Sequence, residues 1–212
     1  MVTVAPTLRR RQRERSAFHS VLFKSKVFLP TIIAKSTALL PRYPHLVPKV
    51  LKISDYDGRG VLAFDLKHLL PLIATVGTDL SWYVIPAAEM TWLLGDLKSL
   101  TPIKELTDKV EDSEIGVQLT WQELCALADS INQCIWATFV GMLLETPWPG
   151  VADMFADDGR YIDRAAPRFY ETTEIAFQAV DSSYWLVYIR DDQVRERSRA
   201  AFDDVEVIDV GE

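Results

Sequence analysis

Residues 175–189 read IAFQAVDSSYWLVYI, and this stretch decides the fold. Its first six residues alternate between two faces, a period-2 pattern that is typical of a β-strand. The short polar residues 181–183 follow, and such side chains favour a tight turn because they bond to their own backbone. The run from Tyr184 to Ile189 alternates again and is rich in the aromatic and aliphatic residues that suit a pleated surface. The stretch therefore predicts strand, tight turn, strand.

The residues that follow add a helix and a last strand. Asp191 and Asp192 are suited to cap a helix, because a carboxylate favours the positive end of the helix dipole. Apolar residues then recur at helical spacing as far as Phe202, and residues 205–210 have the composition of a strand. The arrangement over residues 170–210 is thus strand, turn, strand, helix, strand.

Patterns upstream predict further elements of both kinds. We expect strands at residues 50–54, 80–86, 115–119 and 136–144. We expect helices at residues 66–73 after a capping Asp65, at 86–94 after Pro86, at 103–112, and at 121–135 after the capping box Thr120-Trp121-Gln122-Glu123. The sequence therefore predicts an α+β protein, with a mixed or mostly antiparallel sheet and helices packed on one face.

Charge is distributed unevenly along the 212 residues. Residues 1–54 contain eleven lysines and arginines and one acid, a net charge of +10, whereas residues 55–212 contain twelve basic and twenty-nine acidic residues, a net charge of −17. Such asymmetry is typical of a basic extension on an acidic body. We expect a basic extension with a proline-rich connection over residues 1–48, and an acidic α+β domain over residues 49–212.

The extension contains a dense basic cluster, formed by Arg9, Arg10, Arg11, Arg13 and Arg15. Several interpretations stay open at this stage. The cluster suits a solvated terminus, an organelle-targeting segment, or an arm that binds nucleic acid or anionic lipid. A natural start codon downstream of the cluster is a further possibility. Nucleic acid is therefore expected as a partner only through these arginines.

The two cysteines indicate a reducing compartment. Cys125 and Cys134 fall within one expected helix, where a separation of nine residues directs their side chains to opposite sides. Two such residues cannot form a disulfide with each other. No apolar run approaches the eighteen or so residues of a membrane span. We therefore expect a cytoplasmic protein without a membrane span.

Motifs for catalysis and for cofactor or metal binding are not recognisable in the sequence. The three histidines, His19, His45 and His68, are accompanied by no nucleophile elbow, phosphate loop, dinucleotide fingerprint or zinc cluster. We expect no cofactor and no metal, and we favour a protein without catalytic activity. A hydrolase or transferase built from scattered carboxylates stays open as an alternative, because such residues can be distant in sequence.

The connection over residues 146–167 has the composition of a binding loop. Prolines and glycines break its regular structure, and it combines aromatic with acidic residues, as loops that carry function often do. An ordinary solvated connection held by a few aromatic residues is the alternative. The predicted partner-binding residues are the aromatic anchors Trp148 and Phe155 and the acids Asp153, Asp157, Asp158 and Asp163.

The sequence also resembles a known class of protein. The run Asp181-Ser182-Ser183-Tyr184-Trp185-Leu186-Val187-Tyr188, followed by Asp191 and a helix as far as Phe202, resembles the C-terminal part of immunity proteins that are encoded beside bacterial polymorphic toxins. The segment Leu119-Thr120-Trp121-Gln122-Glu123-Leu124 is similar too, so that the resemblance covers residues 115–210. It implies a non-catalytic cytoplasmic protein that neutralises a cognate toxin, and it assigns no site residues.

Overall fold

The computed structural model describes residues 47–57, 62–85, 91–94, 100–113, 115–155 and 161–210. The chain separates into two compact units, Met1–Arg42 and Tyr43–Glu212, and all the described residues belong to the second unit. The basic cluster at residues 9–15, together with His19 and His45, therefore lies outside the described residues.

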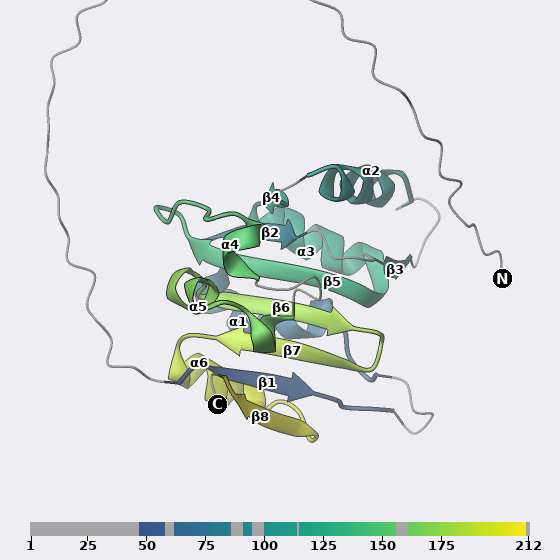
Figure 1. Cartoon of the computed structure of the whole chain (residues 1–212). Coiled ribbons are helices and arrows are strands. Elements are labelled where there is room, and N and C mark those ends of the chain that lie inside the picture. The colour runs from purple at the N-terminus through teal and green to yellow at the C-terminus, as the bar shows by residue number, and fades with distance from the viewer. Residues whose placement is uncertain are drawn as a thin grey trace, which may run out of the picture. The chain divides into compact units, whose positions relative to one another are not determined.

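Within the described residues, eight strands form one sheet in which each pairing is antiparallel (Figure 1). The strands are β1 (Lys49–Ile53), β2 (Leu80–Ile85), β3 (Thr91–Leu94), β4 (Val117–Leu119), β5 (Ile131–Leu143), β6 (Ile175–Val180), β7 (Tyr184–Ile189) and β8 (Val205–Asp209). Their order across the sheet is β4-β2-β5-β6-β7-β1-β8, and β3 pairs with β5 off this path. The predicted α+β class is confirmed.

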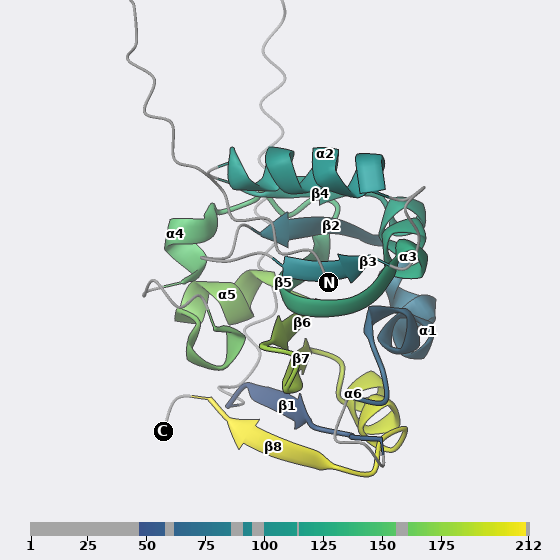
Figure 2. The same ribbon diagram turned by 90° about the vertical axis from the view of Figure 1, so that its right-hand side faces the viewer.

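Helices cover both faces of the sheet. They are α1 (Leu66–Gly77), α2 (Leu100–Glu111), α3 (Trp121–Ser130), α4 (Val151–Met154), the 3-10 helix η2 (Ile162–Arg164), α5 (Pro167–Thr172) and α6 (Asp192–Arg199). Figure 2 shows α1, α3 and α6 on one side of the sheet and the short helices α4 and α5 on the other. The expectation of helices packed on one face thus describes α1, α3 and α6, and the short helices α4 and α5 cover the opposite face.

The hairpin predicted over residues 175–189 forms as expected. The turn between β6 and β7 is closed by a hydrogen bond of 2.9 Å from the Ser183 N–H to the Val180 carbonyl. Asp181 and Ser182 have φ angles of 50° and 56° there, which define the mirror-image turn whose twist matches that of the flanking strands. Every residue of β6 is buried. The alternating pattern therefore separates two apolar cores, one on each face, rather than a core from solvent.

The helix predicted over residues 121–135 is shorter than expected. It begins at its capping box but ends at Ser130, and Ile131 already belongs to β5. Pairing with β3 fixes this segment as a strand, because nonlocal hydrogen bonds override a local apolar spacing that fits both structures. The two cysteines consequently do not share a helix. Cys125 lies in α3 and Cys134 in β5, and both thiols are free.

The helix predicted over residues 86–94 is wrong where the structure describes it. Residues 91–94 form β3, which pairs with residues 131–136 of β5. The strand β2 pairs with residues 138–143 of the same side of β5. β2 and β3 therefore pair one after the other along the same edge of β5. This position depends on the length of β5, and local sequence does not reveal it.

Asp65 joins α1 to the sheet. Its carboxylate accepts hydrogen bonds from the Leu66 N–H at 2.6 Å and from the Cys134 N–H at 3.0 Å, and burial raises its pKa. The Asp65 N–H in turn donates to Nδ1 of His68 at 2.9 Å. His68 therefore completes a helix cap. The helix predicted over residues 66–73 is confirmed, and it buries Leu66, Leu69, Leu70 and Ile73.

Arg190 ties the end of α5 to the end of β7. Its guanidinium donates to the Tyr170 carbonyl at 2.6 Å and to the Thr173 carbonyl at 2.7 Å, and it forms an ion pair of 3.0 Å with Glu174. A cation is favourable at this position because the last carbonyls of a helix lack partners within the helix. Burial raises the pKa of Glu174, and Arg190 partly offsets this effect.

Replacing Thr120 by alanine is expected to destabilise the fold by about 1 kcal/mol, the usual cost of losing an N-cap side chain. Hydrogen bonds from Thr120 lower the pKa of Glu123. Because the folded-state pKa is the lower one, this stabilisation is present above the unfolded value of about 4.3 and is lost as the pH falls below it. Urea unfolding at pH 7 and pH 3.5 measures both effects. Thr78→Ala, an exposed threonine that follows α1, is the control.

Replacing Arg190 by glutamine is expected to cost about 2 kcal/mol at pH 7, because it leaves two carbonyls and a half-buried carboxylate without their partner. Without the cation the pKa of Glu174 rises further. A carboxyl group whose pKa is higher in the folded than in the unfolded state makes the protein less stable as the pH rises above the unfolded value. The destabilisation by Arg190→Gln should therefore grow between pH 4.5 and pH 7. The Glu174→Gln/Arg190→Gln double variant should lack this growth. Equal pH dependence of the two variants in urea unfolding would contradict the role given to Arg190.

Candidate partner-binding surface

One end of the sheet gathers residues that are far apart in the sequence. The antiparallel register pairs Leu80 with Leu143 and Ile175 with Ile189. The first residues of β2 and β6 therefore lie beside the last residues of β5 and β7. We define the sheet-end surface by the residues at and beyond these strand ends: Asp79, Leu143, Leu144, Glu145, Glu174 and Asp191.

Two adjacent leucines at this end are exposed. Leu143 is 41% and Leu144 is 70% accessible to solvent. Leu143 is the last residue of β5, and its carbonyl accepts a hydrogen bond of 2.9 Å from the Thr146 N–H as the chain turns away. Met142, next to it in β5, is fully buried. The leucines therefore extend from the sheet into solvent without a covering element among the described residues.

The carboxylates near these leucines differ in whether they have a partner. Glu174 is paired with Arg190, and Oδ1 of Asp191 accepts the Val194 N–H at 2.9 Å as the N-cap of α6. Asp79 and Glu145 are exposed, and no lysine or arginine of the described residues forms an ion pair with either. Two unpaired negative charges beside exposed leucines suit contact with a basic protein surface that carries an apolar anchor.

The sheet-end surface borders a shallow, open hollow. It has a volume of about 250 Å³, and its walls include Val76, Leu80 and Ile175 as well as Asp79, Glu174 and Asp191. This volume lies below the range of roughly 300–1,000 Å³ that is typical of small-molecule sites. Two of the three carboxylates are already engaged, one by Arg190 and one by the backbone of α6. The arrangement suits a protein contact better than it suits acid–base chemistry on an enclosed substrate.

The structure distributes the predicted loop residues over several environments. Asp153 is exposed on α4, and Asp163 is half-buried on η2, with one carboxylate oxygen buried and without a hydrogen-bond partner. Trp148 is half-buried and stacks on Tyr83, with ring centroids 4.2 Å apart. Asp157 and Asp158 lie outside the described residues. The six residues therefore do not gather at one site where the structure describes them.

Phe155 corrects the prediction of an aromatic surface anchor. Its side chain is only 6% exposed and packs against Phe169, with ring centroids 5.4 Å apart. It belongs to the apolar core that α4, α5 and the sheet enclose. The aromatic residue is retained inside because this face of the sheet must be covered. A partner-binding role stays a prediction for Trp148, Asp153 and Asp163.

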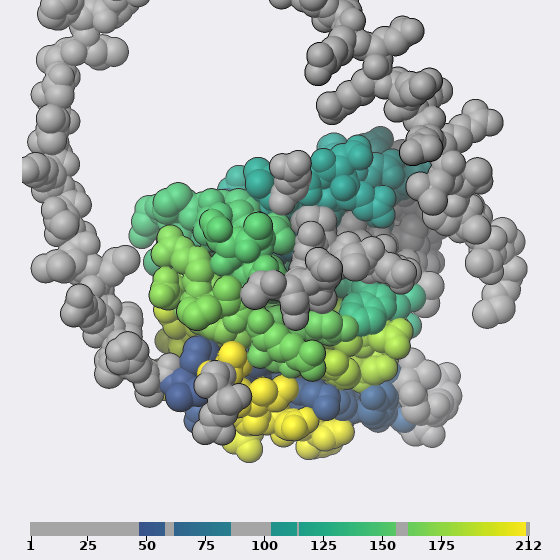
Figure 3. Space-filling view, viewed as in Figure 1, coloured from purple at the N-terminus to yellow at the C-terminus, as the bar shows by residue number. Residues whose placement is uncertain are grey.

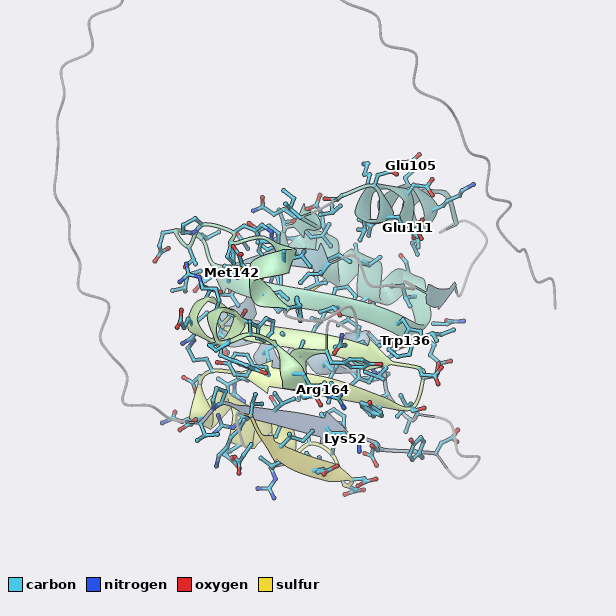
Figure 4. All side chains as sticks on the ribbon, viewed as in Figure 1. Lys52, Glu105, Glu111, Trp136, Met142 and Arg164 are labelled. Atoms are coloured by element: carbon cyan, nitrogen blue, oxygen red, sulfur yellow. The ribbon has the colours of Figure 1, made fainter. Side chains whose placement is uncertain are left out.

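A buried glutamine fixes the position of η2 on the sheet. Gln178 accepts a hydrogen bond of 3.0 Å from the Ile162 N–H and donates one of 2.9 Å to Oγ1 of Thr138. Figure 4 shows Arg164, the last residue of η2, on the same face as Trp136 and Lys52. Gln178, the polar residue in the alternating pattern of β6, thus holds the segment that contains η2. The local sequence pattern did not predict this role.

The leucines of the sheet-end surface were also missed, although the sequence contains a signal for them. Leu143 and Leu144 are adjacent, whereas neighbouring residues of a strand point to opposite faces. A glutamate, a threonine and a proline follow, which end the strand. An apolar pair directly before a strand break, followed by a charge, indicates that at least one of the two side chains is exposed.

Neither a metal site nor a membrane-spanning helix is found among the described residues. No three histidine, cysteine, aspartate or glutamate side chains converge there to hold a metal ion, and no helix of that part of the chain is long and apolar enough to cross a bilayer. No family model, curated protein or solved structure matches this chain.

Proposed function

We propose that this chain is a non-catalytic protein-binding module, an immunity protein that neutralises a cognate toxin by surface complementarity. The observation that carries the proposal is the pair of exposed leucines, Leu143 and Leu144, beside unpaired carboxylates at one end of the sheet. Isolated apolar side chains are common on protein surfaces, but two in sequence with charges around them suit the centre of an interface. The resemblance of residues 115–210 to immunity proteins supports the same function.

The proposed partner presents a basic surface. The chain carries a net charge of −7, and Asp79 and Glu145 add unpaired negative charge where the leucines emerge. A toxin that cleaves nucleic acid needs a basic surface to bind phosphates, and a carboxylate-rich inhibitor covers such a surface directly. Complementary charge accelerates association, whereas buried apolar anchors supply most of the affinity.

The proposal includes the acidic connection and a cytoplasmic location. Asp153 is exposed on α4, so it is accessible to a partner, and Asp157 and Asp158 belong to the same acidic segment of the sequence. A toxin that acts on intracellular nucleic acid must be met in the cytoplasm. The free thiols of Cys125 and Cys134 are compatible with that reducing environment.

Replacing Leu144 by aspartate is expected to weaken toxin binding by about 30-fold or more, the loss typical of a hot-spot residue worth about 2 kcal/mol. The assay is co-expression with the toxin candidate encoded beside the gene, combined with surface plasmon resonance of the purified pair. Ile115→Asp is the matched control, because Ile115 is 57% exposed and lies outside the sheet-end surface. A chain that neither protects cells nor binds this candidate would refute the proposal.

Reversing the charge of Asp79 and Glu145 to lysine is expected to slow association by about tenfold at low salt, with little change in the dissociation rate. The effect should diminish at high ionic strength because salt screens surface charges. The matched control reverses Glu105 and Glu111 on α2, which Figure 4 shows apart from Met142, the residue that precedes Leu143. A second pair, Asp157→Lys with Asp158→Lys, tests the acidic connection separately. Equal association rates for all these variants would remove the electrostatic part of the proposal.

A further inference from the structure

The strand β8 forms an edge of the sheet. Among the described strands it pairs only with β1, and Figures 1 and 2 show no described element beyond it. In the space-filling view of Figure 3, β8 and β1 line the lower border of the visible face. An edge of this kind presents backbone N–H and C=O groups without partners, to which a further strand can bind.

The register identifies which backbone groups of β8 point outward. The Ser54 N–H donates to the Asp204 carbonyl at 3.0 Å, and the Val210 N–H donates to the Pro48 carbonyl at 2.8 Å. In an antiparallel pair, hydrogen-bonded residues alternate with residues that direct both groups to the other side. The backbone N–H and C=O groups of the even-numbered residues in this segment therefore point toward β1. Those of Val205, Val207 and Asp209 point away from it.

The side chains of this edge are acidic with a small apolar component. Asp203, Asp204, Glu206 and Asp209 are all exposed, and within the described part of the chain only Glu206 among them forms an ion pair, of 3.1 Å with Lys52. Val207 is 39% exposed. Its register partner Leu51 belongs to the core under α1, α3 and α6, so an apolar residue added beside Val207 would extend that core.

We propose that β8 binds an extended basic segment of a partner protein as an additional strand. The outward backbone groups of Val205, Val207 and Asp209 supply the hydrogen bonds, and the carboxylates select lysine or arginine side chains. A second copy of this chain is a poor occupant, because β8-to-β8 pairing would bring two sets of these carboxylates together without compensating charge. The inference does not depend on the sheet-end surface, which lies at the ends of other strands.

The experiment uses the full chain and a synthetic peptide that alternates lysine and valine over seven residues. Hydrogen exchange followed by NMR is expected to show that the peptide slows exchange of the Val205, Val207 and Asp209 amides by at least tenfold. Binding should weaken as salt is added, since it includes charge pairs. A peptide of equal charge with a central proline, and one with glutamate in place of lysine, should leave these amides unchanged.

The variant Val207→Pro removes one outward N–H and leaves the groups that face β1 in place. It should abolish the protection by the peptide, whereas Val207→Thr should retain it. Protection of the Ile208 amide, which faces β1, verifies that β8 stays paired in both variants. The proposal is overturned if the peptide does not slow exchange of the outward amides in the unaltered chain, or if Val207→Pro binds the peptide equally well. It is also overturned if self-association protects the outward amides of the unaltered chain without peptide. Loss of peptide binding in Val207→Pro with intact toxin neutralisation would separate this edge from the function proposed above.

Discussion

Burial of the central hairpin on both faces is the constraint on which the rest of the structure depends. Each residue of β6 and all but the first residue of β7 are removed from water. One face is covered by the amphipathic helices α1, α3 and α6. The other requires the segment over residues 151–172, in which α4, η2 and α5 supply apolar side chains. That requirement explains why Phe155 faces inward, although it lies in a connection whose composition otherwise suggests a solvated loop.

Local chemistry made a large part of the fold predictable. The cap of α3 at Thr120 and that of α1 at Asp65 are decided within four residues, and both formed as expected. The hairpin followed from two alternating runs and three turn residues. Residues 91–94 and 131–135 were assigned wrongly because their strand pairing depends on partners up to about 45 residues away, which no local spacing encodes. Helical and extended structures compete closely for such short apolar runs.

The candidate site was less predictable than the fold, and for a related reason. Asp79, Leu144 and Asp191 come together only through the register of four strands, so their proximity is a property of the sheet. Because the chain is rich in acidic residues, no single carboxylate in the sequence indicates a functional site. Their states became distinguishable in the structure, where some serve as caps or ion-pair partners and others stay unpaired. The exposed leucines were marked by their adjacency in the sequence, which an analysis of periodicity alone disregards.

The position of β1 constrains how the chain acquires its structure during synthesis. β1 comprises residues 49–53 and lies between β7 and β8, which end at residues 189 and 209. Its hydrogen-bonding partners therefore do not exist until about 130 further residues, for β7, and about 150, for β8, have been translated. High sequence separation of contacts slows folding. β1 therefore stays without a strand partner until β7 has been synthesised. A nascent chain that stops before residue 184 can form only an incomplete sheet, whose exposed apolar surface chaperones bind.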